Sequence, residues 1–491
     1  MGKKQQIDGS KIKKEIKRNS ELSAGDAILK KALNFFFFFF KLGFMAYGGP
    51  AMLGFIKKEV VYKRNLITED DYNDGIALVS VIPGATNSQM VAYIGYKLKK
   101  GRGAFIAFSA FIIPAFIEML IFTVLYKTSV NIGLFLQVFK ALEAVITAIL
   151  LNTAIMFGSK IIKEWRLDAL AIITLAMLIF KFNILLILLI AVVLTFILFL
   201  IGKKFWPFTG ARKPGEEENN LNEKYQNDKK VKPCAYSNNK AKKENKFNND
   251  YVKNTQLELG DFNVLKKFRV ICSNKTKTIF KIKISIKNFF KTYWAFFAAL
   301  AIVMIALSLS YFLKKNLFLA GLSLTKASVI GFGGAIPMLT VIQYDMVSVL
   351  KILSQKQIID GLVLGQITPG PILMTSTFIG YFIFGFTGAI LCTITAFYPS
   401  FAVFSLVAPK YEAVKNNKYV KLAIRGLMGM FVGMLLFFLY SVGREAIKGY
   451  VSGIFALLSF VAIKFKVKEI YIIAAAAIIS VILYYLNIKI N

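Results

Sequence analysis

Histidine is absent from this chain of 491 residues, and cysteine occurs only three times. The missing histidine excludes histidine-based catalytic triads, histidine metal centres and a histidine pH switch. The cysteines, Cys234, Cys272 and Cys392, have neither the spacing of a metal site nor the pattern of a disulfide framework. We therefore expect a protein that is not an enzyme and that holds no metal or other cofactor.

Acidic residues are scarce as well, 27 against 62 basic residues, which leaves a net charge of +35. Such a charge is compatible with nucleic-acid binding, but the basic residues crowd into the N-terminal tail, the loops and one long insert. Elsewhere apolar stretches of about 18 to 24 residues recur, which is the length of a membrane-spanning helix. This pattern predicts a multi-pass integral membrane protein, in the plasma membrane in preference to an organelle membrane, with the lipid bilayer and not nucleic acid as its partner.

The composition divides the chain into five parts. Residues 1–31 form a basic cytoplasmic tail without a cleavable signal peptide. Residues 32–201 and 315–491 each hold six apolar segments and are predicted to be all α-helical. Residues 202–290, rich in Lys, Asn and Glu, are predicted to be a disordered linker. One extra transmembrane helix is expected at residues 291–314.

The two six-segment halves repeat one another at a nearly constant spacing. The matching pairs are Lys41 to Gly49 with Lys326 to Gly334, Asp74-Gly75 with Asp360-Gly361, Pro83-Gly84 with Pro369-Gly370, and Ile94 to Tyr96 with Ile379 to Tyr381. So many Gly and Pro residues at one spacing indicate a duplicated membrane unit.

Each half contains apolar segments that are interrupted by glycine and proline, at Gly48-Gly49-Pro50 and Pro83-Gly84, and at Gly333-Gly334 and Pro369-Gly370-Pro371. In lipid, a broken helix persists only where it is buried in protein or lines a cavity. Broken segments at corresponding places in two halves are a sequence sign of a transporter binding site. Whether these segments span the membrane or re-enter it is left open by the sequence.

Loop charges predict that the halves are inverted relative to one another. The tail and the linker are both basic and are expected in the cytoplasm. Residues 97–102 carry four positive charges, whereas their counterparts, residues 382–387, carry none. The extra helix then starts the second half from the opposite side of the membrane.

These motifs together resemble the chromate ion transporter family, in particular its long two-domain members. The resemblance rests on Phe40 to Pro50, on the stretch from Asp74 to Gln89 and on Gly365 to Tyr381. It covers about residues 32–201 and 317–487. The chain departs from the family pattern at Leu66 and Ile352, where a Trp is usual, and at Ala85, where a Pro is usual.

The resemblance implies secondary transport of chromate, a tetrahedral dianion, with coupling to protons or another ion. Alternatives left open are a transporter or channel for sulfate or another anion, and a membrane scaffold that acts through its basic linker. A homo-oligomer is a further open alternative.

Physical chemistry points to the same kind of site. A dianion in a medium of low dielectric constant needs compensating partners. Helix N-termini at the breaks offer N–H donors, but each dipole end supplies at most about 2 kcal/mol, so fixed cations are also expected. Lys41 and Lys326 lie at equivalent positions, roughly 12 Å into their segments at 1.5 Å per residue. A structural ion pair with an acid such as Glu118 is the alternative role for these lysines.

Polar side chains near the breaks are candidates either for substrate contacts or for helix caps. Glu118 is the candidate for proton coupling, with an interfacial acid as the alternative. The expected substrate-binding residues are Lys41, Gly48, Gly49, Pro83, Gly84, Asn87, Gln89, Lys326, Gly333, Gly334, Thr368, Pro369, Gly370, Pro371 and Thr375.

Overall fold

The computed structural model describes residues 32–45, 51–129, 132–161, 164–201, 274–411 and 417–490. This part of the chain consists of helices and short connections and contains no strand. The predicted basic tail, the Gly48-Gly49-Pro50 break and residues 202–273 of the predicted linker lie outside the described residues.

The first half begins with a helix at Ala32–Met45. The helices that follow are α2 (Ala51–Lys57) with the π-helix η1 (Lys58–Lys63), α3 (Glu69–Val81), α4 (Thr86–Ser129), α5 (Gly133–Ile161), α6 (Trp165–Ile179) and α7 (Ile184–Ile201).

The second half follows the same order after α10 (Asn274–Leu313). Its elements are α11 (Lys315–Ile330), α12 (Ala335–Gln343) with η5 (Tyr344–Val349), α13 (Gln355–Ile367), η6 (Ile372–Met374), α14 (Thr375–Val407) with η7 (Ala408–Lys410), α16 (Lys418–Ala446), α17 (Tyr450–Lys464) and α18 (Glu469–Tyr485). When the two halves are aligned, the first and last residues of α16 correspond to those of α5. The first and last residues of α13 likewise correspond to those of α3. The two homologous halves expected from the repeat are therefore confirmed in the structure.

Equivalent polar residues start the equivalent helices α3 and α13. The side chain of Thr68 accepts a hydrogen bond from the backbone N–H of Asp71. Ser354, the counterpart of Thr68 in the second half, accepts from the N–H of Gln357 and forms a capping box with it. Because such caps satisfy backbone donors that a helix start leaves free, they fix where each helix begins.

The Pro-Gly break of the first half is the tip of a helical hairpin. The chain reverses between α3 and α4, so that Lys97 Nζ lies 2.7 Å from Asp71 Oδ1 across the open end of the hairpin. A Cβ on Gly75 would lie 2.5 Å from the ring of Tyr93, which shows how closely the two helices pack. Residues 69–98 therefore turn back on themselves.

A second reversal follows at once inside α4, where Lys99 and Lys100 leave helical geometry. A Cβ on Gly95 would lie only 2.3 Å from the carbonyl oxygen of Gly103. The second half repeats this feature in α14, which bends at Phe384 and Gly385 and brings Gly380 against Gly388. The matched glycines at 95 and 380 are therefore required by close backbone crossings.

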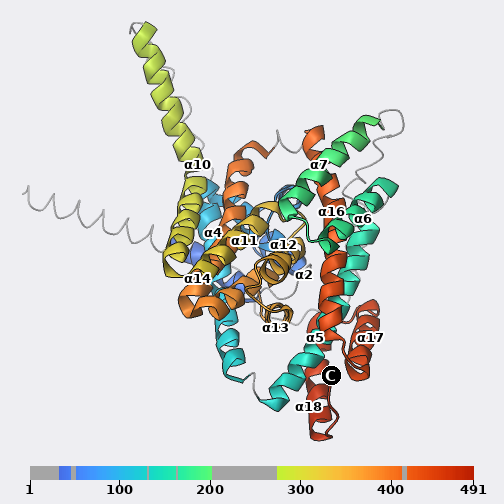
Figure 1. Ribbon diagram of the computed structural model, residues 1–491. Helices are drawn as coiled ribbons and strands as arrows, with labels where there is room; N and C mark the ends of the chain where they lie inside the picture. Colours follow the sequence, from blue (N-terminus) through green and yellow to red (C-terminus); the bar gives the residue numbers. More distant parts are fainter. Residues whose placement is uncertain are drawn as a thin grey trace, which may run out of the picture.

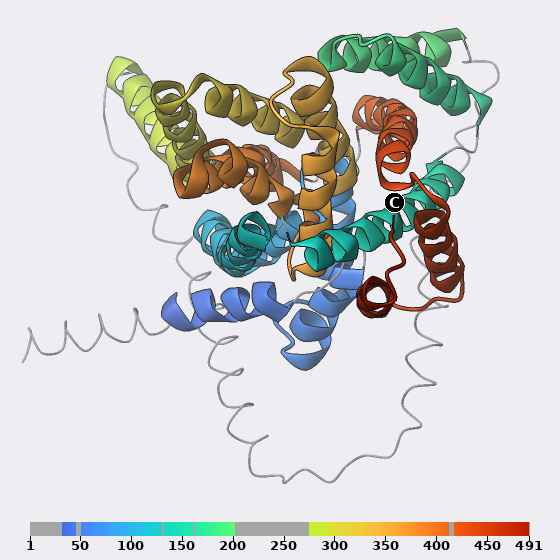
Figure 2. The same ribbon diagram turned by 60° about the horizontal axis from the view of Figure 1, so that its bottom comes forward.

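The two halves are interlocked through their C-terminal helices. The first half's α5 packs against α16, α17 and α18, while the second half's α16 packs against α6 and α7. Figure 1 shows these helices on one side of the molecule and α4, α10, α11 and α14 on the other, with α2, α12 and α13 between them. In Figure 2 the blue helices of residues 32–63 lie together along one edge.

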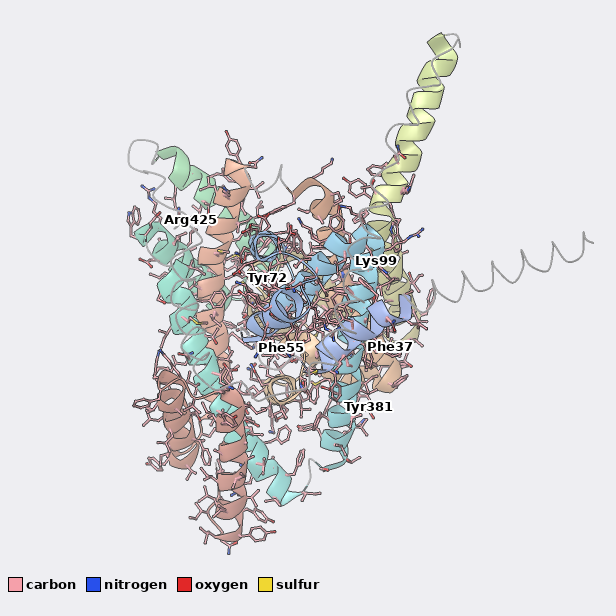
Figure 3. All side chains as sticks on the ribbon, turned by 180° about the vertical axis from the view of Figure 1, so that it is seen from behind. Phe37, Phe55, Tyr72, Lys99, Tyr381 and Arg425 are labelled. Carbon is pink, nitrogen blue, oxygen red and sulfur yellow. The ribbon has the colours of Figure 1, made fainter. Side chains whose placement is uncertain are left out.

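Side-chain contacts hold α2 against α3 and the helix Ala32–Met45 against α4. Tyr72 on α3 donates a hydrogen bond of 2.7 Å to the carbonyl oxygen of Leu53 on α2. Figure 3 labels Tyr72 and, on α2, Phe55. The Nζ atom of Lys99 lies 4.6 Å from the ring centroid of Phe35.

Five helices in the described part are long and apolar enough to cross a membrane. They lie at Thr86–Ser129, Gly133–Ser159, Asn288–Leu313, Ile372–Lys410 and Tyr419–Ala446. The expected extra helix is among them, but α10 begins at Asn274 and so takes in residues that the sequence assigned to the linker. The protein is an all-α, multi-pass membrane protein.

Candidate functional site

Breaks from both halves meet in the interior. The backbone N–H of Gly84 donates a hydrogen bond of 3.0 Å to the carbonyl oxygen of Gly331. A Cβ on Gly334 would lie 3.0 Å from Thr86 Oγ1, so the first residue of α4 faces the residue that precedes α12. The short helix η6, which follows the break at residues 368–371, packs against both α12 and α4. Three of the four predicted breaks are thus gathered in one place.

Each Pro-Gly tip also contacts the opposite half directly after the proline inside its long helix. A Cβ on Gly84 would lie 2.5 Å from Ser400 Cβ, directly after Pro399. A Cβ on Gly370 would lie 2.4 Å from Ala115 Cβ, directly after Pro114. Ala115 and Ser400 occupy equivalent positions in the two halves, so the two contacts are equivalent under the repeat.

The glycines in these breaks adopt backbone angles that other residues rarely take. The φ angles are +123° at Gly84, +89° at Gly333, +107° at Gly334 and +109° at Gly370. A side chain at Gly84 or Gly334 would be strained and would also fill the space between the two halves. These four positions are glycine in the sequence because the backbone conformation of the breaks requires it.

The helix α12 starts at this meeting point without a side-chain cap on its N-terminus. At α14 the turn η6 precedes the helix, and the backbone N–H of Thr375 bonds to the carbonyls of Ile372 and Leu373. The first N–H groups of a helix have no partners within that helix and carry the positive end of its dipole. At α12 these groups lie where the breaks meet, which favours an anion there.

The predicted polar side chains near the breaks are unequally free to bind a ligand. Thr368 donates its hydroxyl to the carbonyl of Leu364 at 3.0 Å, and Thr375 donates to that of Ile372 at 2.9 Å. Gln89 is fully buried and donates to the carbonyl of Pro83 at 3.2 Å, while its Oε1 lacks a partner among the described residues. Asn87 is half-buried on the first turn of α4. Both threonine hydroxyls are therefore bound to carbonyls of the preceding turn, whereas Gln89 retains an unsatisfied oxygen.

Lys326 forms an ion pair with Asp345, which lies on the returning arm of its own hairpin. The side chain of Asp345 is 6% exposed and also accepts a hydrogen bond of 2.7 Å from Ser323. Asp345 was not predicted as a site residue. The partner of Lys326 is this aspartate and not Glu118, the acid considered from the sequence.

Lys41 has a different setting from its repeat counterpart. Its side chain is exposed on the helix Ala32–Met45, whose outer face is marked by Phe37 in Figure 3. That helix contacts α4 at Pro114, because a Cβ on Gly43 would lie 2.9 Å from the proline ring. Gly48 and Gly49 follow it and lie outside the described residues.

Glu118 lies one turn after Pro114 in α4. Both its carboxylate oxygens are buried, and neither has a hydrogen-bond partner among the described residues. A second group of buried acids, Glu143 and Asp360, was not predicted as part of a site. The only sequence signal was Asp360, which has its repeat counterpart in Asp74.

Comparison with known proteins agrees with the repeat. The model of the chromate transporter family matches residues 33–196 and again residues 316–481. An uncharacterized transporter of Methanocaldococcus jannaschii is 27% identical over 405 residues, 82% of this chain and 83% of the relative. A probable chromate transport protein of Synechococcus elongatus is 21% identical, with 91% and 94% covered.

A chromate transport protein of Cupriavidus metallidurans is 22% identical over 457 residues, 91% of this chain and 92% of that relative. No solved structure matches the chain. The double family match spans most of both halves, with the breaks of the candidate site inside it. The chain therefore belongs to the chromate transporter family.

Proposed function

We propose that this ion transporter carries an inorganic oxyanion across the plasma membrane, with chromate as its first substrate, and that the oxyanion binds where the breaks of the two halves meet. The observation that carries this proposal is the contact between Gly84 and Gly331, which places the N-termini of α4 and α12 next to one another. The names of the relatives from Synechococcus and Cupriavidus support chromate.

Backbone donors alone are not sufficient for a dianion. Each helix N-terminus contributes at most about 2 kcal/mol, whereas transferring a charge out of water costs far more. Lys326 is the nearest fixed cation by sequence, since it lies on the hairpin whose tip is Gly333-Gly334. We assign it the role of charge partner, together with Lys41 from the other half.

The ion pair between Lys326 and Asp345 sets a condition on this role. While the pair is closed, it contributes no net positive charge to the site. Substrate binding therefore requires the ammonium group to turn from Asp345 to the oxyanion, while Ser323 holds Asp345 in place with its hydrogen bond. The free energy lost when the ion pair opens is then offset by the attraction between the ammonium group and the bound dianion.

The remaining expected residues have supporting roles in this proposal. The breaks are assigned to the glycines and prolines, namely Pro83, Gly84, Gly333, Gly334, Pro369, Gly370 and Pro371, with Gly48 and Gly49 in the equivalent segment. The polar residues assigned to their surroundings are Asn87, Gln89, Thr368 and Thr375. Glu118 is proposed as a proton carrier, because a buried carboxylate without a partner is stabilised by a proton.

The test is uptake of radiolabelled chromate, sulfate and molybdate into proteoliposomes that hold the full chain, at two pH gradients. The proposal predicts saturable uptake, fastest for chromate, and a response to the gradient. Uptake no faster than in empty vesicles for every oxyanion would contradict it. Flux that does not saturate would indicate a channel.

A further inference from the structure

The interface between the halves contains a buried cluster of ionisable side chains outside the breaks. Its members are Tyr126 on α4, Glu143 on α5, and Lys356 and Asp360 one turn apart on α13. It lies where α13 packs against α4 and α5 (Figure 1). Two elements come from the first half and one from the second, so the cluster joins the halves.

The contacts within the cluster are short and directional. Lys356 Nζ lies 2.9 Å from Glu143 Oε1 and 3.4 Å from Asp360 Oδ1. The hydroxyl of Tyr126 donates to Asp360 Oδ2 at 2.5 Å. One ammonium group is therefore shared by two carboxyl groups.

The surroundings exclude water from the acids and not from the base. The side chains of Glu143 and Asp360 are 6% and 1% exposed, against 38% for Lys356. The ring of Tyr126 packs against four aromatic rings, those of Phe135, Phe139, Phe378 and Phe382, at centroid distances between 5.0 and 5.9 Å. Water therefore reaches the cluster at Lys356, whereas the two carboxyl groups are shielded from it.

Charge counting shows what the cluster lacks. With both carboxyl groups ionised, it holds one positive and two negative charges. Within the described residues, the titratable groups that act on the two acids are the cluster's own members. An uncompensated charge in such a place is strongly unfavourable, and a proton on one carboxyl group removes it.

The repeat shows that this composition is not required by the fold. Tyr126 and Asp360 have counterparts in Tyr411 and Asp74, but the positions equivalent to Glu143 and Lys356 are Met428 and Asp70. The second carboxyl group and the ammonium group are therefore present on one side only. An asymmetric group in a duplicated frame points to a function other than holding the halves together.

We propose that Glu143, Asp360 and Lys356 form a proton-binding site that couples transport to the proton gradient. The site takes one proton from water, which converts a carboxylate to a carboxylic acid and brings the cluster from a charge of −1 to zero. Protonation of Glu143 weakens its ion pair with Lys356 and so loosens α5 from α13. Release of the proton restores the pair. This inference rests on the proposed transport function.

The first test separates coupling from transport. In proteoliposomes, Glu143→Gln is expected to keep exchange of labelled for unlabelled chromate, and to lose the accumulation that a pH gradient drives in the wild type. Glu143→Asp, which restores a carboxyl group, should recover part of it. The matched control is Glu164→Gln, which removes an acid paired with Arg425 between α6 and α16 and should accumulate chromate as the wild type does.

The outcomes decide between the two proposals. Gradient-driven accumulation by Glu143→Gln equal to that of the wild type would overturn the proton site and leave the transport function intact. Absence of chromate and sulfate exchange in the wild type would contradict the transport function instead.

A second measurement needs no substrate. Infrared titration of the purified protein should show the carbonyl band of a protonated carboxyl group that Glu143→Gln loses or shifts. Lys356→Met should keep that band to higher pH, because loss of the ammonium group favours the protonated acid. The same band and titration in all three proteins would overturn the proposal, even if one variant transports poorly.

Discussion

The amide of Gly84 donates to the carbonyl of Gly331 over 3.0 Å and so joins the break of one half directly to the break of the other. The two residues are far apart in sequence and come from different repeats. The contact makes the two hairpin tips one structural unit. Any movement of one half against the other must therefore act on this bond.

Replacing Gly84 by Ala should destabilise the protein. At a φ of +123° the new Cβ is strained and lies 2.5 Å from Ser400 Cβ. We expect a loss of about 1–3 kcal/mol in the free energy of unfolding, measured by thermal or denaturant unfolding in detergent. Gly54→Ala is the control, because a Cβ there meets nothing within 4 Å. Equal unfolding curves for Gly84→Ala and the wild type would contradict the packing described.

Lys326→Met should reduce both stability and substrate affinity, for separable reasons. Removing the ammonium group leaves the carboxylate of Asp345 buried and unpaired, which costs about 3–5 kcal/mol. The double variant Lys326→Met with Asp345→Asn should restore the melting temperature, because no buried charge remains. It should still bind chromate at least tenfold more weakly, about 1.4 kcal/mol. Recovery of both properties together would make Lys326 a structural residue.

Lys41→Met tests whether the repeat extends to substrate binding. The side chain is exposed, so its loss should leave the melting temperature unchanged. A unit charge 4 Å from another is worth about 4 kcal/mol at an effective dielectric constant near 20, and a tenfold increase in the KM for uptake is expected even after desolvation is subtracted. An unchanged KM would remove Lys41 from the site.

The inverted arrangement predicts that residues 97–102 and 382–387 face opposite sides of the membrane. Arg102 and Thr387 are both exposed and lie near the two chain reversals. In a chain whose native cysteines are replaced, Arg102→Cys and Thr387→Cys should react with an impermeant thiol reagent from opposite sides. Labelling of both from one side would exclude inverted repeats.

The sequence was informative where backbone geometry demands a particular residue. The glycines at 84, 334 and 370 are visible in the sequence because only glycine adopts their φ angles readily. The repeat made each of these residues recognisable twice. Helix caps such as Ser354 also depend on residue type and on near neighbours in the sequence.

Side-chain pairing across hairpins and between halves could not be predicted in this way. The partner of Lys326 lies on the returning arm of its hairpin, and Tyr126 reaches Asp360 across 234 positions of sequence. Nothing local marks such pairs, because ordinary Asp, Glu and Tyr residues acquire partners only when the helices pack. The exposure of Lys41 against the pairing of Lys326 shows that equivalent sequence positions need not have equivalent surroundings.

Equilibrium dialysis of labelled chromate against the purified protein tests most directly that the oxyanion binds where the two halves meet. Gly334→Ala places a methyl group 3.0 Å from Thr86 Oγ1, at the start of α12. Gly385→Ala is the matched control, since Gly385 also has a positive φ but a Cβ there meets nothing within 4 Å. We predict that Gly334→Ala raises the Kd at least tenfold, about 1.4 kcal/mol, while Gly385→Ala binds as the wild type does. A folded Gly334→Ala protein with the Kd of the wild type would contradict the account.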